Sequence, residues 1–466
     1  MTTFYAGMDE LERFIREHPG CTYIELMVPD MSGQLRGKRL SPKAARKLFG
    51  EDAEGVRLPG SNYLLDATGR NIDGLEYGGA DGDPDFFCHA VPGSLAPVPW
   101  AAESAGQVLA SMADAAGRPH FADPRHVLAC VMDRLDKLGL RAVMAIELEF
   151  HLIDAKAMRE GRIEPARLPL SGRRPGTVNV YGLDDLGEFS ALFADIAQTC
   201  AAQGLDAETA VSEYGPGQYE INLLHRADAL AACDQAVLLK RAIKACALRH
   251  GAIATFMAKP FAERAGNGLH VHVSLVDEAG ANIFSGQDQD GRIGRAISAR
   301  MKQAIAGLVA TMGEGMAIFA PNANSYRRLR PGTYAPVSAI WGGDNRTLPI
   351  RIPGGDDADT RIEHRVAGAD ASPYLVAAAV LAGIHHGLVH ELEPPAPVAG
   401  DGYEQGGAPL PLFWPEALKA FAGGGILGGY FDAEWRRAYL AARWQELQEH
   451  HFTIPQLDYD WYLTTA

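Results

Sequence analysis

The sequence predicts an α+β fold of two unequal domains, with helices flanking an antiparallel sheet in the larger one. A chain of 466 residues exceeds the size at which one hydrophobic core keeps growing, so two domains are expected. Long amphipathic helical patterns alternate with short strand patterns, and several of these strands carry charged residues at every second position. Such alternation is typical of an antiparallel sheet with one functional face.

The first hundred residues predict the smaller domain. A helical pattern covers Met8 to His18 and a strand pattern covers Tyr23 to Val28. A proline-rich run from Val91 to Trp100 follows and marks a boundary. We therefore expect one domain over residues 1–104 and a second over residues 105–466.

The remaining chain supplies the helices and strands of the larger domain. Helices are predicted over Pro124–Leu138, Leu183–Gln203, Ala227–His250 and Ile293–Met312. Strands are predicted over Ala142–Ile153, Gln218–Leu223, Leu269–Val276 and Arg361–Val366.

Charge and composition exclude several classes of function. The formal net charge of -15 disfavours nucleic acid and anionic membrane surfaces as partners. The N-terminal residues lack a basic segment followed by an apolar run, and no stretch reaches membrane-spanning length, so a cytoplasmic protein is expected. The six cysteines are scattered without a CxxC pair, which favours reduced thiols over disulfides or a zinc site.

Carboxylates and imidazoles recur on the predicted strands. Glu147 and Glu149 are spaced i, i+2, so both side chains leave one face of a strand, and His270 and His272 repeat that spacing. A further pair of carboxylates, Glu213 and Glu220, flanks a Gly-Pro-Gly turn that folds the two toward one point; the segment 361–365 adds Glu363 between two arginines.

These groups match the ligands of a hard divalent ion bound to a nucleotide. Mg²⁺ and Mn²⁺ prefer carboxylate oxygens, and imidazole suits Mn²⁺ better than Mg²⁺. Each motif alone is more often a polar strand edge. Four such motifs on strands that otherwise appear buried favour a metal–nucleotide site, because unpaired buried carboxylates are costly.

Arginines provide the opposite charge. Planar guanidinium groups suit bidentate contacts to phosphate and carboxylate. Arg346 and Arg351 lie in apolar, strand-like surroundings and are the stronger candidates, whereas Arg327 and Arg330 taken singly fit a solvated basic face.

From about residue 15 to residue 390 the chain resembles the glutamine synthetase family. The resemblance rests on specific motifs, which are Asp30–Lys38, the Glu-Leu-Glu strand, Gly215–Glu220, Ala258–Pro260, Asn324–Arg328 and Arg361–Arg365. It implies a small N-terminal β-grasp domain, a large catalytic domain, and a homo-oligomeric ring with active sites between subunits. It also implies glutamate and ATP as substrates, with two or three Mg²⁺ or Mn²⁺ ions in each site.

The resemblance also implies roles for individual residues. The first metal ion would be held by Glu149, Glu213 and Glu220, and the second by Glu147, His270 and Glu363. Glutamate and the phosphorylated intermediate would contact Arg328, Arg365 and the backbone of Gly266. The nucleotide and its phosphates would contact His272, Ser274, Arg346, Arg351 and Arg361. Asp85 would reach a neighbouring subunit's site, and either Asp85 or Glu213 would take the proton from the amine.

One departure from the family bears on the substrate. Where glutamine synthetases carry a glutamate that binds ammonium, this chain has Tyr334 in Pro331–Pro336. Loss of that anion weakens capture of a small hydrated cation, whereas a phenol offers an apolar wall to a larger amine. The run Trp341–Thr347 is likewise similar to the subgroup that γ-glutamylates polyamines and other organic amines.

The sequence thus favours a glutamate–amine ligase that forms a γ-glutamyl phosphate intermediate. An ammonia-using glutamine synthetase is the alternative enzyme, and a non-catalytic relative kept as a structural protein is a more distant one. The C-terminal segment departs from the family's usual ending, so both a hexamer and a dodecamer stay open.

Overall fold

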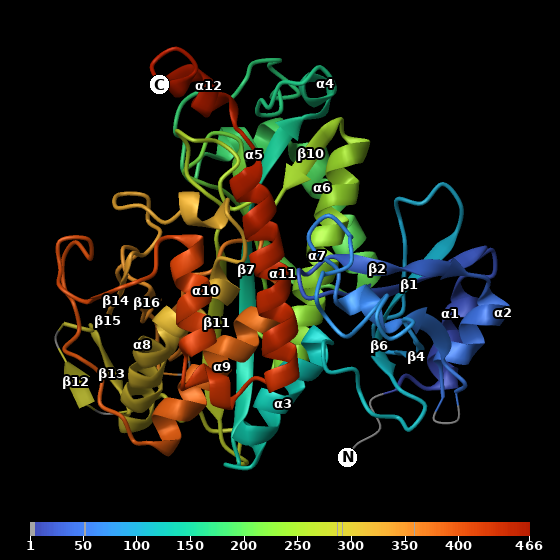
Figure 1. The fold of residues 1–466 in the computed structure, drawn as a ribbon, viewed down its shortest axis with the longest axis horizontal. Coiled ribbons are helices and arrows are strands. Elements are labelled where there is room, and N and C mark those ends of the chain that lie inside the picture. The colour runs from blue at the N-terminus through green and yellow to red at the C-terminus, as the bar shows by residue number, and fades with distance from the viewer. Residues whose placement is uncertain (1–4, 51–52, 287, 291, 358) are drawn as a thin grey trace.

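The computed structural model describes residues 5–50, 53–286, 288–290, 292–357 and 359–466. Its N-terminal part forms a lobe to one side of a larger body, through which the long strand β7 (Arg141–Asp154) runs (Figure 1). The fold is of the predicted mixed class, with helices packed around sheets. None of the helices among the described residues combines the length and the hydropathy needed to cross a bilayer.

Six strands of the N-terminal part pair in the order β2-β1-β6-β4-β3, with β5 also on β6. Their bounds are β1 Tyr23–Pro29, β2 Leu35–Leu40, β3 Val56–Pro59, β4 Asp85–Ala90, β5 Ala96–Pro97 and β6 Ala105–Ala113. Strands β1 and β6 run parallel, and the other pairs are antiparallel. Since β6 belongs to this sheet, the sheet continues past residue 104, where the predicted boundary lies; the division into two domains stays a prediction.

An eight-stranded sheet forms the floor of the larger part, in the order β15-β16-β17-β11-β7-β9-β8, with β10 also on β7. Its strands are β7 Arg141–Asp154, β8 Ala207–Ser212, β9 Gln218–Leu223, β10 Ala252–Thr255, β11 Leu269–Val276, β15 Trp341–Gly342, β16 Ile350–Arg351 and β17 Ile362–His364. The pairs are antiparallel except β15 with β16, so the predicted antiparallel sheet is correct apart from one short edge pair.

The helices of the described residues, in chain order, are α1 Met8–Glu17, α2 Pro42–Ala45, α3 Pro124–Asp136, α4 Ala155–Arg159, α5 Leu183–Glu188, α6 Ser190–Gln203, α7 Ala229–Arg249, α8 Ala299–Phe319, α9 Pro373–Val389, α10 Trp414–Gly423, α11 Ala433–Phe452 and α12 Gln456–Tyr462. Helices α3 and α7 contact strand β7 of this sheet, and α8 packs against both α9 and α10 beside them. Helix α9 is apolar on all sides and almost wholly buried. It approaches α8 so closely that a Cβ on Gly307 would lie 2.0 Å from the carbonyl oxygen of Gly383, so a side chain at position 307 would displace the backbone.

Two of the predicted helices need correction. The segment Leu183–Gln203 is divided into α5 and α6 at Phe189. The helix predicted from Ile293 begins only at Ala299, because the Ser298 side chain caps it and the three residues from Arg295 pair as strand β13 (Arg295–Ile297) with β12 (Asp288–Asp290). A second two-stranded sheet joins β14 (Ser338–Ala339) to β18 (Ala408–Pro409).

Candidate active site

Strands β7 and β9 bring carboxylates together on one face of the large sheet. Glu147 and Glu149 leave the same side of β7, and the register of the two strands places Glu220 directly opposite Glu149. Glu213 follows the end of β8, in a hairpin that turns through Gly217 at a φ of 82°. The hairpin thereby returns Glu213 to the same region as Glu220.

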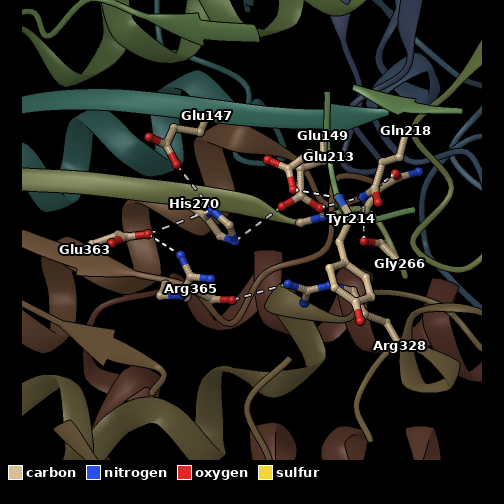
Figure 2. Close-up of polar contacts among 12 residues, drawn as sticks. Glu147, Glu149, Glu213, Tyr214, Gln218, Gly266, His270, Arg328, Glu363 and Arg365 are labelled. Carbon is tan, nitrogen blue, oxygen red and sulfur yellow. Dashed lines mark hydrogen bonds and ion pairs between the residues drawn. The ribbon is translucent and has the colours of Figure 1, made fainter. Parts of the chain in front are cut away.

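Strands β11 and β17 extend this face to the other side of β7. His270 lies opposite Glu147, and Glu363 lies opposite His272. Beyond β17, strand β16 places Arg351 opposite Glu363. The charged side chains therefore converge because of strand pairing, and Figure 2 shows Glu147, His270 and Glu363 at one end and Glu149 and Glu213 at the other.

Three carboxylates form what we call the carboxylate cluster: Glu149, Glu213 and Glu220. One oxygen from each lies within 4.8 Å of the others. Burial, together with the charge of Glu149, raises the pKa of Glu213 to about 7, and burial beside Glu147 and Glu149 raises the pKa of Glu220 well above its ordinary value. The cluster has too little positive charge of its own, and a divalent cation bound to these oxygens would supply it.

Two glutamates and two histidines form what we call the arginine-paired cluster: Glu147, His270, His272 and Glu363. Nδ1 of His270 lies 3.3 Å from Glu147 Oε2 and 3.9 Å from Glu363 Oε1. Nε2 of His272 lies 3.0 Å from Glu147 Oε1. Oxygens of Glu147 and Glu363 and a nitrogen of His272 lie within 4.8 Å of one another, so a metal ion could be held here too.

Arginines balance the carboxylates of this second cluster. Arg351 and Arg365 each pair with one oxygen of Glu363, and Nε of Arg361 donates to His272 Nδ1 at 3.1 Å. Burial alone would raise the pKa of Glu363, but the charges of Arg365, the two histidines and Arg351 lower it to about 2. Burial of Glu147 is likewise outweighed by His272 and His270, which hold the pKa of Glu147 well below its ordinary value.

The remaining predicted site residues have the following contacts in the structure. Arg328 is buried and donates to the carbonyl oxygen of Val366 at 2.8 Å, so its guanidinium lies beside the two clusters. His272, expected at the nucleotide, lies against Glu147, and its role at the nucleotide stays a prediction. Ser274 is half-buried on β11, two positions beyond His272. Asp85 is exposed at the start of β4, opposite Pro59, and no contact among the described residues joins it to the clusters.

A cavity of about 740 Å³ opens beside Arg351 and Arg346. Tyr334 and residues 398–401 also line this cavity. Arg351 is oriented there by Asp344, which accepts from Nε at 2.8 Å and from Nη2 at 2.7 Å. The volume and the positive lining suit a polyanionic ligand.

A second aromatic residue, Tyr214, lies beside Tyr334, and sequence reasoning gave it no role. The ring centroids are 6.1 Å apart at an angle of 60°, and both side chains are about half exposed. Tyr334 has a φ of 56°, a conformation that bulky residues adopt rarely and mostly at functional sites. In Figure 2 the Tyr214 ring projects from the Glu213 end of the site toward the side of Arg328. The sequence signal that could have identified Tyr214 is its position directly after Glu213.

Comparisons with known proteins show what the whole chain is similar to. The family model described as "Glutamine synthetase, catalytic domain" matches residues 121–462. Gamma-glutamylputrescine synthetase PuuA of Escherichia coli strain K12 is 39% identical over 461 residues, which cover 99% of this chain and 96% of that protein. Glutamate–isopropylamine ligase of a Pseudomonas species is 33% identical, with 94% of each chain covered. A solved structure titled "GmaS/ADP complex-Conformation 1" superposes with a TM-score of 0.83 at 27% identity, covering 97% of this chain and 99% of that one.

Proposed function

The chain belongs to the glutamine synthetase family, and from this premise we propose how it acts as an ATP-dependent ligase that joins the γ-carboxylate of glutamate to an organic amine. A γ-carboxylate oxygen attacks the γ-phosphorus of ATP, and ADP leaves. The amine nitrogen then attacks the carbonyl carbon of γ-glutamyl phosphate, the C–O bond to phosphate breaks, and the amine loses a proton. The products are a γ-glutamylamide, ADP and phosphate.

Residues of this chain supply binding and charge for both steps. We assign the phosphates of ATP to Arg346, Arg351 and Arg361, which lie at or next to the cavity beside the arginine-paired cluster. Arg328 and Arg365 would hold the glutamate carboxylates and the charge that develops on the transferred phosphoryl group. Gly266 would contact glutamate through its backbone. Only glycine fits at this position, because a Cβ there would lie 2.4 Å from the Ala258 carbonyl oxygen and 2.9 Å from Cγ of Arg328.

Divalent metal ions fit the two clusters. The all-oxygen donor set of Glu149, Glu213 and Glu220 suits Mg²⁺ or Mn²⁺, and the mixed set with histidine suits Mn²⁺. We propose two or three ions in each site. When bound, they would neutralise the phosphates of ATP and the crowded carboxylates.

The observation that carries an organic amine as acceptor is the pair of half-exposed rings, Tyr214 and Tyr334, of which Tyr214 follows Glu213 directly in the chain. An ammonium group attached to carbon chain is attracted by aromatic faces, and its methylene groups gain apolar contact that the ammonium ion lacks. Glu213 lies close enough to orient the amine and take its proton, and Asp85 of a neighbouring subunit is the second candidate. The names of the relatives, which specify putrescine and isopropylamine, support this class of acceptor.

We also propose a homo-oligomeric ring in the cytoplasm. Asp85 is exposed at the end of the N-terminal sheet, a position from which it can enter the site of an adjacent subunit rather than its own. Both a hexamer and a dodecamer are compatible with this proposal.

A steady-state comparison tests the function. Initial rates of ADP release with glutamate and ATP are measured for ammonium, putrescine and isopropylamine, for the wild type and for Tyr334→Glu. We expect the highest kcat/KM with an organic amine, and a shift of the ratio toward ammonium in Tyr334→Glu. A higher kcat/KM for ammonium than for every organic amine would instead identify an ordinary glutamine synthetase.

A further inference from the structure

A buried hydrogen-bonded network lies behind the carboxylate cluster and involves His151, Asn267 and Gln218. We propose that His151 is a positioning residue which, through Asn267 and Gln218, fixes both the metal ligand Glu149 and the Gly266 backbone. The inference rests on the proposed function for the roles of Glu149 and Gly266. The network itself is given by contacts within the chain.

His151 belongs to the functional face of strand β7. It follows Glu147 and Glu149 at the same i, i+2 spacing, so all three side chains leave one side of the sheet. Unlike the two glutamates, it is fully buried, and its ring meets the Phe261 ring edge-on at 5.5 Å. A histidine with no exposure must be bound to a partner within the protein.

That partner is Asn267, whose side chain has only one possible orientation. Its Nδ2 donates to the carbonyl oxygens of Met257 at 2.8 Å and Thr255 at 3.3 Å. Oδ1 therefore faces His151 Nδ1, 2.8 Å away. Since Oδ1 can only accept, the hydrogen of the imidazole must be on Nδ1.

Gln218 passes this constraint to the site. Its Oε1 accepts from the Gly215 backbone N–H at 2.9 Å, so its Nε2 points toward the cluster. Nε2 lies 3.0 Å from Glu149 Oε2, 2.9 Å from the Gly266 carbonyl oxygen and 3.2 Å from Asn267 Oδ1. Two hydrogens thus serve three acceptors, and the division between them depends on how well Asn267 Oδ1 is satisfied elsewhere.

His151 provides the hydrogen bond that Asn267 Oδ1 would otherwise take from Gln218. With its N–H on Asn267 Oδ1, the hydrogens of Gln218 are left for Glu149 and Gly266. Glu149 Oε2 also accepts from the Gly268 N–H at 2.7 Å, so Oε1 is the oxygen left for a metal ion. Without the histidine N–H, Asn267 draws a hydrogen of Gln218 away from Glu149 or Gly266. The damage should therefore reach metal and glutamate binding first. Among the described residues, His151, Asn267 and Gln218 have no hydrogen bond or ion pair with the arginine-paired cluster, and its only link to Glu149 is the 3.9 Å separation between His270 Nε2 and Glu149 Oε1.

Two substitutions of similar polarity distinguish loss of the hydrogen bond from His151 to Asn267 from a mere change in side-chain packing. The amide nitrogen of His151→Asn is attached at the same position as Nδ1 and keeps a donor for Asn267, whereas that of His151→Gln is one atom further out. For each we would measure the dissociation constant of Mn²⁺ by electron paramagnetic resonance of the free ion, KM for glutamate, KM for ATP, and thermal unfolding. The control is His390→Gln, which replaces an exposed histidine directly after the C-terminal end of α9.

We expect His151→Gln to weaken Mn²⁺ binding and raise KM for glutamate by about 10-fold or more, with KM for ATP within about 2-fold of wild type. His151→Asn should stay within about 3-fold on all three quantities. Equal effects of the two variants, or a rise in KM for ATP as large as that for glutamate, would overturn the proposal. The proposed function has its own test: it fails if the wild-type enzyme shows no turnover with an organic amine. Even then, the Mn²⁺ dissociation constants of the two His151 variants would still test the network.

Discussion

The carboxylate cluster (Glu149, Glu213, Glu220) and the arginine-paired cluster (Glu147, His270, His272, Glu363) share one sheet face but differ in electrostatic balance. In the first, carboxylates crowd one another, and the pKa values of Glu213 and Glu220 are raised. In the second, arginines and imidazoles surround the carboxylates, and the pKa values of Glu147 and Glu363 are lowered. The two ends of one site are therefore prepared for different ligands.

The difference indicates which charges the protein brings and which it must take up. The carboxylate cluster is complete only with an incoming cation, because crowding and burial disfavour the ionised forms of Glu213 and Glu220 without one. The arginine-paired cluster is already neutralised, so its guanidinium groups are held in place before a polyphosphate arrives. Preorganised cations at one end and a cation requirement at the other fit a metal-dependent phosphoryl transfer.

Removal of one ligand from the carboxylate cluster should have the largest effect. In Glu220→Gln we expect kcat/KM for ADP release to fall at least about 1,000-fold, beyond the 10- to 100-fold typical of residues that only support a metal ligand. Glu208→Gln, on the exposed side of neighbouring strand β8, should retain wild-type rates. A Glu220→Gln enzyme with more than a tenth of wild-type activity would contradict the role assigned to this cluster.

The stability of the metal-free protein should respond in opposite directions at the two ends. With a chelator present, Glu220→Gln should raise the free energy of unfolding by about 1–3 kcal/mol, because it removes a buried carboxylate from a repulsive cluster. Glu363→Gln should lower it by about 3 kcal/mol, because Arg351 and Arg365 lose their buried partner. Urea unfolding at pH 7 measures both. Two changes of the same sign would remove the distinction between the clusters.

The sequence predicted the strands of the site and the face from which their charged side chains project. Strands β9 and β11 agree with their predicted bounds, because alternation of apolar and charged residues carries both the period and the face. The convergence of Glu149, Glu213 and Glu220 was implied by motifs of the glutamine synthetase family. The family and the ligase chemistry are confirmed by the comparisons.

The rest depended on packing that no local pattern carries. Helix α9 was not predicted, since it is apolar on all sides and lacks an amphipathic signal. The contact of His272 with Glu147 depends on side-chain conformations across two paired strands, which spacing alone does not fix. His151 was overlooked although it continues the alternation of Glu147 and Glu149, because a lone histidine among apolar residues usually indicates only core packing.

The pH dependence of stability should also differ between the clusters when metal is absent. The pKa of Glu213 is raised to about 7, so between pH 4.5 and 7 the folded protein binds more protons than the unfolded chain, and the free energy of unfolding falls as pH rises. The pKa of Glu363 is lowered to about 2, so its contribution is fully present above pH 4.5 and is lost as pH falls toward 2.

Chemical unfolding from pH 4.5 to 7 in the presence of a chelator measures the first slope. It amounts to at most about 1.4 kcal/mol per pH unit for one group, and Glu213→Gln should flatten it. Saturating Mn²⁺ should reverse the slope in the wild type, because metal binding needs the ionised carboxylates. A Glu213→Gln protein with the wild-type slope would mean that this carboxylate is not in the repulsive cluster.

The smallest expected effect concerns the ring of Tyr214, the residue that follows Glu213 of the carboxylate cluster. Tyr214→Ala should raise KM for an organic amine by about 10-fold, which corresponds to about 1.4 kcal/mol of lost aromatic contact, while KM for ATP and Mn²⁺ affinity stay unchanged. Tyr214→Phe keeps the ring and should stay close to wild type, as should Phe413→Ala at an exposed ring next to α10. If only KM for the amine rises, the amine acceptor binds beside the carboxylate cluster, which also requires the metal ion. An equal loss for ATP would instead place Tyr214 with the arginine-paired cluster, against the separation of amine and phosphate sites that the two electrostatic environments imply.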